Sequence, residues 1–329
     1  MAYTTIDDPE AYFQVKIWTG TGSSNALTLD GDTDMQPDLV WIKSRSDAQN
    51  NILTDAVRGT NKNLYSDATS AEATTTDNIT AFGSDGFTVA GGGNETNGSS
   101  KTYVAWNWKE SATSGFDIIQ FTGNSTARTI SHSLSAVPKM ILMKNITNGA
   151  AQWVVYHVST GNTQALYLNT SATPTDVLGF FNDTDPTSSV FTVGTDTAVN
   201  GNTNGQICYA WSEKQGFSSM GSYIGNGNAD GPFIWTNGMR PAMIIIKSAT
   251  EVRNWRMFDN KRSAYNLTDE VLYPDLSNAE ATGDSEIDML SNGFKLRKTS
   301  DNTSGETYIY MAFSEAPLVN SKSVPCNAR

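Results

Sequence analysis

Cysteine, histidine and charged residues are all scarce in this sequence. The 329 residues include 2 Cys and 2 His, and only 17% of them carry a charge. Two cysteines are too few for a disulfide scaffold or a cysteine-based zinc site, so we expect Cys208 and Cys326 to be free thiols. Neither His132 nor His157 has a second histidine at the spacing of metal ligands. We therefore expect no metal and no cofactor.

Long apolar segments are also absent. No run of residues approaches the ~18 that a membrane-spanning helix needs, which argues against membrane insertion. Residues 1–8 (MAYTTIDD) have neither a basic start nor an apolar core, so we expect no signal peptide and synthesis in a cytosol. The 34 acidic residues outnumber the 22 basic ones, and the net charge of -12 disfavours binding to nucleic acid or anionic lipid.

The motifs of several large enzyme classes are missing. The sequence contains no Walker loop, no dinucleotide fingerprint and no Gly-x-Ser-x-Gly nucleophile turn. Its glycine run, residues 91–93, has no helix signal after it and is typical of a flexible loop. We predict that the protein is not an enzyme. A Ser-His-Asp triad or a facing pair of glycosidase carboxylates stays open, because geometry rather than sequence defines both.

One acidic segment resembles the start of a calcium-binding loop. Residues 30–34 (DGDTD) begin like an EF-hand loop, but Met35 and Trp41 occupy the positions that need a glycine and an acid. Residues 183–185 form a similar acidic stretch. We interpret both as solvated turns, because Asp is a common turn residue. A weak calcium site of another type stays open.

The sequence does contain a repeat with three copies. Each copy opens with a strand-like segment that ends in glycine, and the three glycines, Gly20, Gly123 and Gly225, are 103 and 102 residues apart (123 − 20; 225 − 123). A second landmark runs from a proline through apolar residues to a lysine, at residues 37–43, 138–144 and 241–247. Its continuous apolar run predicts a central strand that is covered on both faces.

Four more landmarks follow in the same order in every copy. They are a strand that ends in a polar residue, a Leu-Tyr pair, a phenylalanine after a turn, and an aromatic closing strand. Short strands at this spacing predict an all-β fold of three tandem β-sandwich (jelly-roll-like) repeats of about 100 residues. The predicted domains are 1–110, 111–214 and 215–329, the last with a short C-terminal tail.

Short linkers between the repeats predict that the three units pack closely. Whether they form separate sandwiches or one fused body stays open at this point. Helix signals are weak throughout the chain. The two best candidates for a single helical turn are residues 70–73 and 278–281, at matching places in the first and third units.

A lysine and a polar residue recur at a fixed distance in each unit. Lysines at 43, 144 and 247 precede, by 12 or 13 residues, the polar residues Asp55, His157 and Asp259. Hairpin geometry predicts that each pair lies across neighbouring strands as an ion pair that fixes the register. A repeated ligand site is the alternative, although the histidine at position 157 breaks the pattern.

Exposed aromatic side chains can stack on sugar rings. The candidates are Trp18, Trp108, Trp235 and Tyr223. Packing inside or between units explains the recurring positions better than ligand binding does. Trp108 and Trp235 have no evident counterparts in the other units, so we predict these two as candidate glycan contacts on the surface.

Several longer motifs are distinctive of one group of proteins. They include residues 2–9 (AYTTIDDP), 36–43 (QPDLVWIK), 55–59 (DAVRG), 84–89 (SDGFTV), 103–109 (YVAWNWK), 292–297 (NGFKLR) and 308–320 (YIYMAFSEAPLVN). Together these motifs resemble a group of marine tailed-bacteriophage proteins. The resemblance extends from the first residue to the last, so we expect a complete chain. Members of the group are usually described as virion structural proteins, often of the tail or tail fibre.

The resemblance implies a place on the particle exterior, as tail, tail fibre or capsid decoration. The implied role is host-surface attachment or shell reinforcement, and it assigns no catalytic or binding residue. Other virion proteins are then the expected partners, and particle symmetry favours a homo-oligomer, with a trimer as first choice. Two alternatives from other functional classes are a lectin-like module that binds a host surface glycan and a polysaccharide depolymerase.

Overall fold

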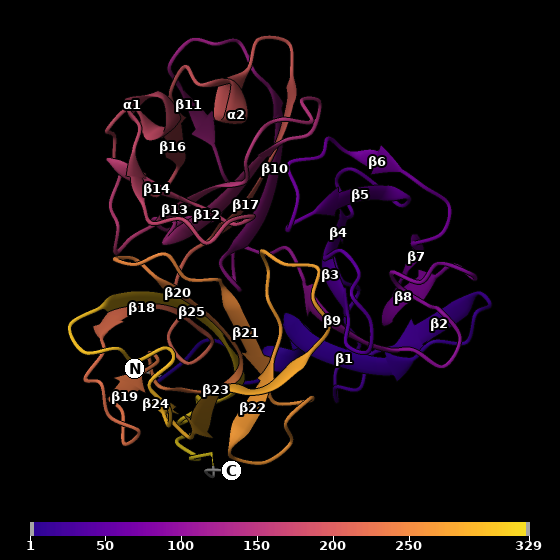
Figure 1. The fold of residues 1–329 in the computed structure, drawn as a ribbon, viewed down its shortest axis with the longest axis vertical. Coiled ribbons are helices and arrows are strands. Elements are labelled where there is room, and N and C mark those ends of the chain that lie inside the picture. The colour runs from indigo at the N-terminus through magenta and orange to yellow at the C-terminus, as the bar shows by residue number, and fades with distance from the viewer. Residues whose placement is uncertain (1–2, 327–329) are drawn as a thin grey trace.

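The computed structural model describes residues 3–326 and is nearly all β. The strands form three sandwich-like units that pack closely around a common centre, and each unit forms its own lobe in Figure 1. Ala2 of the N-terminal motif and residues 327–329 of the predicted tail lie outside the described residues.

Unit 1 has one large and one small antiparallel sheet. The large sheet has the order β1-β9-β3-β4-β5-β6 and the small sheet the order β2-β8-β7, so first pairs with last and second with second-last. This nested pairing is jelly-roll-like. After a 3-10 helix at Pro9–Ala11, the strands are β1 (Phe13–Thr19), β2 (Asn25–Thr28), β3 (Leu39–Ser44), β4 (Ile52–Asp55), β5 (Lys62–Tyr65), β6 (Ala73–Thr74), β7 (Ile79–Gly83), β8 (Gly86–Val89) and β9 (Thr102–Trp108).

Unit 2 repeats this plan. Its large sheet has the order β10-β17-β12-β13-β14-β15, and its small sheet consists of β11 and β16. Two single-turn helices, α1 and α2, cover the end of the sandwich. The elements are β10 (Phe116–Thr122), β11 (Arg128–Ser131), β12 (Met140–Asn145), β13 (Val154–His157), β14 (Gln164–Tyr167), β15 (Thr175–Asp176), α1 (Leu178–Phe181), β16 (Val190–Val193), α2 (Thr197–Asn200) and β17 (Gly205–Trp211).

Unit 3 divides its strands more evenly. The two sheets have the orders β18-β25-β20-β21 and β19-β24-β23-β22. The strands are β18 (Ser218–Ile224), β19 (Phe233–Trp235), β20 (Met239–Ser248), β21 (Arg256–Asp259), β22 (Thr268–Val271), β23 (Ala281–Leu290), β24 (Gly293–Leu296) and β25 (Thr307–Pro317).

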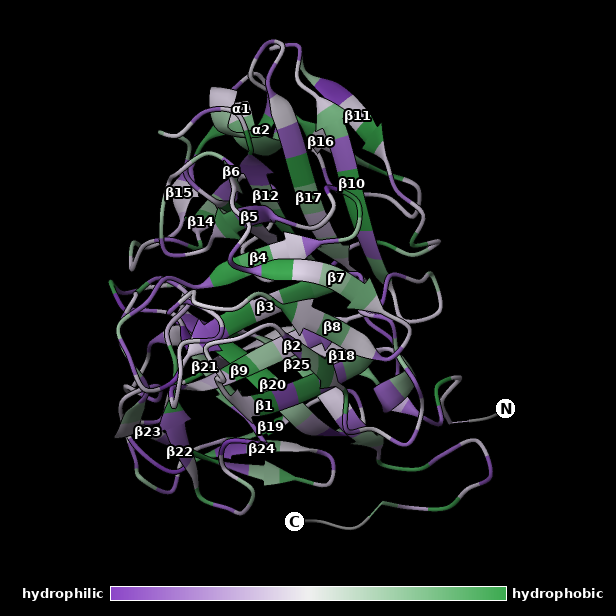
Figure 2. Cartoon of the chain, turned by 90° about the vertical axis from the view of Figure 1, so that its right-hand side faces the viewer, coloured by the Kyte–Doolittle hydropathy of each residue, from purple (hydrophilic) through white to green (hydrophobic). Residues whose placement is uncertain are grey.

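The apolar run before each repeated lysine forms a strand that is buried on both faces, as the sequence predicts. In β3, Leu39 and Trp41 face a core shared by all three units, whereas Val40 and Ile42 face the private core of unit 1. The equivalent strands β12 and β20 divide their residues in the same way. Figure 2 shows that hydrophobic residues concentrate on the strands, while the loops are mostly hydrophilic.

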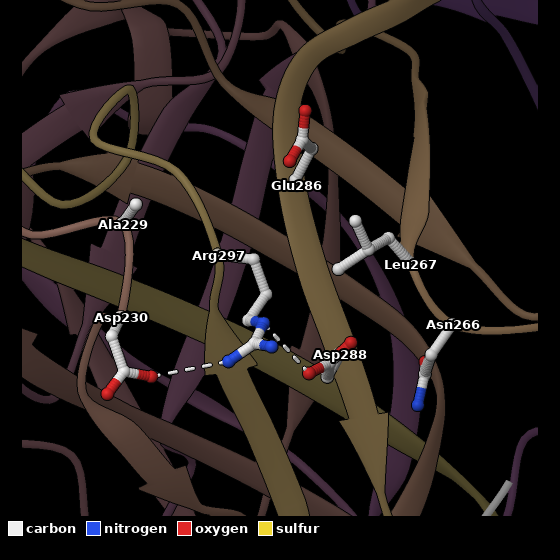
Figure 3. Close-up of a pocket in the computed structure, with 7 residues that line it drawn as sticks. All are labelled: Ala229, Asp230, Asn266, Leu267, Glu286, Asp288 and Arg297. Carbon is white, nitrogen blue, oxygen red and sulfur yellow. Dashed lines mark hydrogen bonds and ion pairs between the residues drawn. The ribbon is translucent and has the colours of Figure 1, made fainter.

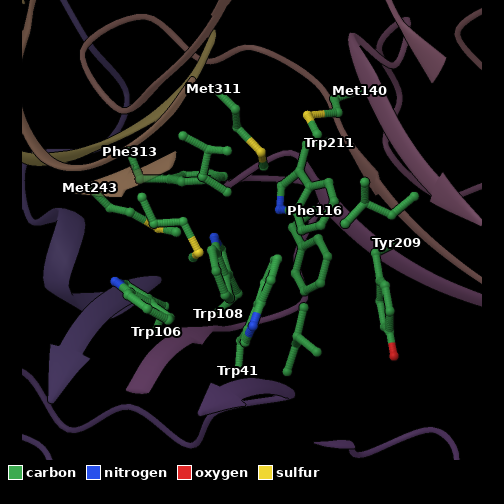
Figure 4. Packing of buried hydrophobic residues seen from close by; sticks show 14 of the residues in the cluster. Trp41, Trp106, Trp108, Phe116, Met140, Tyr209, Trp211, Met243, Met311 and Phe313 are labelled. Carbon is green, nitrogen blue, oxygen red and sulfur yellow. The ribbon is translucent and has the colours of Figure 1, made fainter. Parts of the chain in front are cut away.

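Three aromatic residues meet at the centre of the shared core. The ring centroids of Trp108 and Trp211 are 6.1 Å apart, those of Trp108 and Phe313 are 5.5 Å apart, and those of Trp211 and Phe313 are 6.4 Å apart. Each comes from the closing strand of a different unit, and Figure 4 shows them converging. The three units therefore form one fused body with an approximate threefold arrangement.

The sheet register corrects the alignment of the closing strands. Trp108 lies opposite Leu39, just as Trp211 lies opposite Met140 and Phe313 opposite Met243. Trp108 thus has counterparts in both other units and is only 2% exposed. The prediction that it lies on the surface is wrong, because the alanine–aromatic pair that recurs in the closing strands (105–106, 210–211 and 312–313) shifts the apparent alignment by two residues.

Equivalent hydrogen bonds join each unit to the one before it. Trp153 of unit 2 donates its Nε1–H to the Tyr65 carbonyl of unit 1 at 2.8 Å, and Trp255 of unit 3 donates to the Tyr167 carbonyl of unit 2 at 2.9 Å. In unit 1 the corresponding residue is Asn51, whose Nδ2 donates to Tyr273 O of unit 3 at 3.0 Å. The three junctions therefore close into a ring.

The predicted helical turns are wrong, because neither segment is helical and each leads into a strand, at Ala73 and Ala281. The backbone amide of Glu72 donates to the Ile146 carbonyl of unit 2 at 2.9 Å. In the same way the amide of Glu280 donates to the Arg45 carbonyl of unit 1 at 2.8 Å. Hydrogen bonds to the neighbouring unit replace those of a local helix, so packing between units overrides the weak helix propensity.

The predicted cross-strand ion pairs are also wrong. Asp55 lies opposite Leu39, which is four residues before Lys43, and this offset is about 13 Å along a strand. Asp259 is likewise opposite Met243 rather than Lys247. Each lysine instead donates to backbone carbonyls, with Lys43 Nζ 2.7 Å from Gln49 O and Lys144 Nζ 2.7 Å from Thr69 O. Burial lowers the pKa of Lys43, Lys144 and Lys247 to about 8 in each case.

The repeated polar residues join units rather than strands. Asp55 accepts a hydrogen bond from Tyr209 Oη of unit 2 at 2.7 Å, and Asp259 accepts one from Trp106 Nε1 of unit 1 at 3.1 Å. Both aspartates also form buried ion pairs, with Arg58 at 2.5 Å and Arg262 at 2.6 Å.

His157 occupies the same place in unit 2 but acts as a neutral group. Its Nε2 lies 3.1 Å from the Tyr310 carbonyl of unit 3, and its Nδ1 accepts from the Ser159 amide at 3.1 Å. The neutral tautomer with a proton on Nε2 satisfies both partners. Complete burial lowers the pKa of His157 to about 4.

Candidate functional site

The outer face of one sheet in unit 3 carries both exposed aromatic and charged side chains. Along β19, Ile234 points into the private core, whereas Phe233 and Trp235 on either side of it are 46% and 53% exposed. The register places Phe233 opposite Lys295 on β24, and Lys295 opposite Asp288 on β23. These side chains therefore share one surface, which we call the unit 3 face.

A depression of about 620 Å³ lies on the same sheet. Lys295, which is opposite Phe233, reaches its rim through the 2.6 Å contact with Asp230. Its walls come from β23, from the segment after β24, and from the loops that precede β19 and β22 (Figure 3). The residues that line it are Ala229, Asp230, Asn266, Leu267, Glu286, Asp288 and Arg297.

The guanidinium of Arg297 is held between two carboxylates. Its Nε lies 3.1 Å from Asp288 Oδ2, and its Nη1 lies 3.3 Å from Asp230 Oδ1 (Figure 3). Lys295 lies 2.6 Å from the same Asp230 oxygen, and this hydrogen bond holds the pKa of Asp230 below its ordinary value. Arg297 is thus fixed in orientation while it remains partly exposed.

Asn266 forms a rigid wall on the other side of the depression. Its side chain donates from Nδ2 to Met289 O at 3.0 Å and accepts at Oδ1 from Met289 N at 2.9 Å. The amide group therefore pairs with β23 as a neighbouring strand would. This anchoring leaves Tyr265 and Leu267 exposed, by 83% and 44%.

Strand β19 is also held by a side chain from the sheet that packs against it. Tyr310 Oη donates to the Trp235 carbonyl at 3.2 Å and lies 3.2 Å from Ser219 Oγ of the opposite sheet. A Cβ added to Gly293 would overlap the Ile234 carbonyl oxygen and would lie 2.9 Å from the Phe233 ring. The glycine therefore permits the close approach of the β19 backbone and of that ring.

The other two units have no such aromatic pair at equivalent positions. The register places Ile234, Leu27 and Ile130 at corresponding points, because each lies opposite a buried phenylalanine. Phe233 and Trp235 then correspond to small residues, which are Ala26 and Thr28 in unit 1 and Thr129 and Ser131 in unit 2. The core-facing residues of these three strands are therefore alike. Of the outward-facing residues on either side of them, those of unit 3 alone are aromatic.

Of the four sequence-predicted aromatic candidates, only Trp235 is an exposed side chain on the unit 3 face. Trp18 is half-buried, stacks on Tyr103 at 5.3 Å and donates its Nε1–H to Thr96 O. Tyr223 is buried and stacks on Tyr308 at 5.1 Å. Phe233 and Arg297 are not among the sequence-predicted residues. Phe233 lies two residues before Trp235 in a strand-like segment, which is a usable signal, whereas no sequence pattern links Arg297 to Trp235.

The acidic loops and the second histidine have local partners. Asp30 pairs with Lys16 at 2.5 Å, and Asp185 accepts from Asn162 at 2.8 Å. His132 Nε2 lies 3.1 Å from the Thr187 carbonyl. Within residues 3–326, no three His, Cys, Asp or Glu residues gather as a metal site would require. Both cysteines are free thiols, as predicted.

A second group of carboxyls lies at the linker between units 1 and 2. Burial and the neighbouring Asp117 raise the pKa of Glu110 to about 7. All three members of the group accept backbone hydrogen bonds: Glu110 from Ile118 N, Asp117 from Ser133 N, and Asp38 from Glu110 N. This group therefore positions the first strand of unit 2.

Comparison with known proteins gives one match. A family model described as a domain of unknown function, DUF7483, matches residues 8–317. No curated protein and no solved structure matches. Among the residues that the structure describes, no helix is long and apolar enough to cross a membrane.

Proposed function

The chain belongs to the DUF7483 family, and from this starting point we propose that it is a non-enzymatic structural protein of a tailed-bacteriophage virion. In this proposal the protein lies on the particle exterior, as tail, tail fibre or capsid decoration. Its role there is host-surface attachment or shell reinforcement. The sequence motifs that resemble marine phage proteins support this proposal.

The structural observation that carries the proposal is the closed ring of three units around one aromatic core. Interlocking units with fully buried junction residues, such as Asp55, His157 and Asp259, make a rigid body. Close packing of this kind resists deformation. Rigidity suits a part that must transmit load or present a surface on the outside of a particle.

The approximate threefold arrangement also suits a particle built on symmetry. A body with three similar lobes can dock on a threefold axis by making similar contacts from each lobe. Other virion proteins are the proposed partners. We further propose a homo-oligomer, with a trimer favoured, because components of particles follow their symmetry.

Immunogold labelling of intact particles, imaged by electron microscopy, tests the proposal. We expect an antibody to this protein to label the tail, the fibres or the head surface. Label at tail or fibre tips supports attachment, and label spread over the head supports shell reinforcement. Particles that carry the protein by mass spectrometry but no label on their exterior would refute an exterior location, and particles without the protein would refute the whole proposal.

A further inference from the structure

We propose that the unit 3 face is a binding site for a neutral oligosaccharide. Phe233 and Trp235 form its stacking platform, and Arg297 with its flanking carboxylates forms its polar end. This inference rests on the proposed attachment role and names the chemical class of the receptor.

The exposed aromatic pair is the first observation behind the inference. Phe233 and Trp235 leave roughly half of their surface in water, although aromatic side chains are the residues that gain most from burial. The corresponding residues of the other units are small, so the fold itself does not require rings at these positions. A ligand that covers the rings accounts for their presence in unit 3 alone.

The spacing of the two rings fits an extended ligand. Residues two apart on a strand lie on the same face, about 7 Å from each other. Each ring can therefore meet a different sugar ring of one chain. The apolar C–H face of a sugar packs on an aromatic face, and its hydroxyls stay free to form hydrogen bonds at the edges.

The polar end offers both donors and acceptors in fixed positions. The fork of Arg297 donates, and the carboxylates of Asp288 and Asp230 accept. Sugar hydroxyls do both, so they match this mixture better than a purely anionic or cationic ligand does. The depression of about 620 Å³ also falls within the range of roughly 300–1,000 Å³ that is common for small-ligand sites.

The charge balance of the site favours a neutral glycan. Its carboxylates are Asp230, Glu286 and Asp288. Its cations are Arg297 and the two lysines that pair with the same carboxylates, Lys295 and Lys298. Three negative and three positive groups cancel. A polyanionic saccharide or a phosphorylated headgroup would meet the carboxylates without a compensating excess of cations.

The test uses the purified full-length chain on an array of neutral and charged bacterial surface glycans and of neutral hexasaccharides, followed by calorimetry with the best neutral binder. We expect a neutral glycan to bind. The variant F233T/W235S, which installs the unit 2 residues, should weaken that binding about 10- to 100-fold, since stacking on each ring contributes roughly a factor of 3 to 10. Arg297→Lys keeps the charge but removes the fork, and it should weaken binding by a smaller factor.

Two matched controls separate recognition from general stickiness and from misfolding. Ile224→Thr and Val252→Thr remove side chains of unit 3 that are 65% and 69% exposed and lie off the unit 3 face, so both should bind as the original protein does. Thermal unfolding of F233T/W235S should match the original within a few degrees, because both residues are exposed. A folded F233T/W235S variant with undiminished binding overturns the proposed site.

The outcomes also distinguish this inference from the virion proposal. Exterior label on particles without binding to any neutral glycan overturns the inference and leaves the virion proposal intact. Binding only to anionic glycans or to lipid vesicles likewise overturns it. Glycan binding that depends on Trp235, in a protein absent from particles, supports the site and refutes the virion role.

Discussion

The junction between units 3 and 1 and the junction between units 2 and 3 occupy equivalent places in the ring but differ in charge. Across the first, the guanidinium of Arg45 pairs with Glu280 at 2.8 Å, and Lys43 Nζ donates to Ser277 O at 3.0 Å. Across the second, His157 makes a neutral hydrogen bond to Tyr310 O, and the residue that corresponds to Glu280 is Pro174. Proline has no N–H, so the backbone hydrogen bond of the other junctions cannot form there.

The two junctions also differ in covalent linkage. Units 2 and 3 are joined by the short linker 213–216, which keeps their facing surfaces at a high effective concentration. Units 3 and 1 lie at opposite ends of the sequence and meet through side-chain and backbone contacts alone. The Arg45–Glu280 ion pair therefore connects two units at the junction that has no peptide link.

Breaking the buried pair at the closing junction should have the largest effect. Asp259→Ala leaves Arg262, whose side chain is 0% exposed, without its 2.6 Å partner, and it leaves Trp106 Nε1 without an acceptor. We expect the free energy of unfolding to fall by about 3–5 kcal/mol, as is usual when one member of a buried pair is removed. Urea unfolding measures it. Asp47→Ala, which removes a half-exposed pair with Lys101, is the control and should cost less than about 1 kcal/mol.

The neutral junction should instead be sensitive to acid. The pKa of His157 is about 4 in the fold against 6.5 for a free histidine, so the folded state binds fewer protons between these values. Stability from this group is fully present above about pH 6.5 and is lost as the pH falls towards 4, by up to about 3 kcal/mol.

The variant His157→Gln isolates this contribution. Burial raises the pKa of Asp275 to about 7, and Glu110 behaves alike, so these two groups stabilise the fold as the pH falls. Because the original protein and the variant both contain these groups, their effect cancels when the stabilities of the two proteins are compared. The loss of stability between pH 7 and pH 4.5 should be smaller in His157→Gln than in the original. Equal losses in urea titrations at the two pH values would contradict the neutral junction.

The smallest expected effect concerns the partly exposed pair at the closing junction. Arg45→Ala removes a two-pronged contact with Glu280, whose side chain is 13% exposed, while Arg262 still pairs with that carboxylate. We expect a loss of about 1 kcal/mol that shrinks in 1 M salt. Arg45→Lys should lose nearly as much, because it keeps the charge without the fork. A loss that is insensitive to salt would mean that the side chain acts through packing.

The repeat pattern predicts much of this fold and little of its site. Spacing of the glycine and lysine landmarks predicts three β units and their central strands correctly, because an apolar run buried on both faces is a local signal. The prediction of cross-strand ion pairs is wrong because the loop between β3 and β4 sets the register. No residue pattern shows that Asp55 lies opposite Leu39. The prediction of a surface position for Trp108 is wrong because the alignment of the closing strands is evident only from the pairing of strands in the sheet.

The unit 3 face depends on contacts that the sequence does not display. Trp235 is identifiable as an aromatic residue without a counterpart, but Arg297, on the same face of the sheet, is 62 residues away in the chain (297 − 235). Only the pairing of β19, β24 and β23 brings the two onto one surface. The same applies to the ring, because the sequence gives no sign that units 1 and 3 are neighbours.

Ring closure makes the order of the units along the chain arbitrary. Residues near both ends lie together beside unit 3, where Ser321 N donates to Asp7 Oδ1 at 2.6 Å and Thr4 Oγ1 donates to Gln215 O at 2.8 Å (Figure 1). A circular permutant that joins these ends and opens the chain at the linker 109–115 would have the same three neighbours in the same ring. The closing junction would then have become a linked one, and the former linker the new seam.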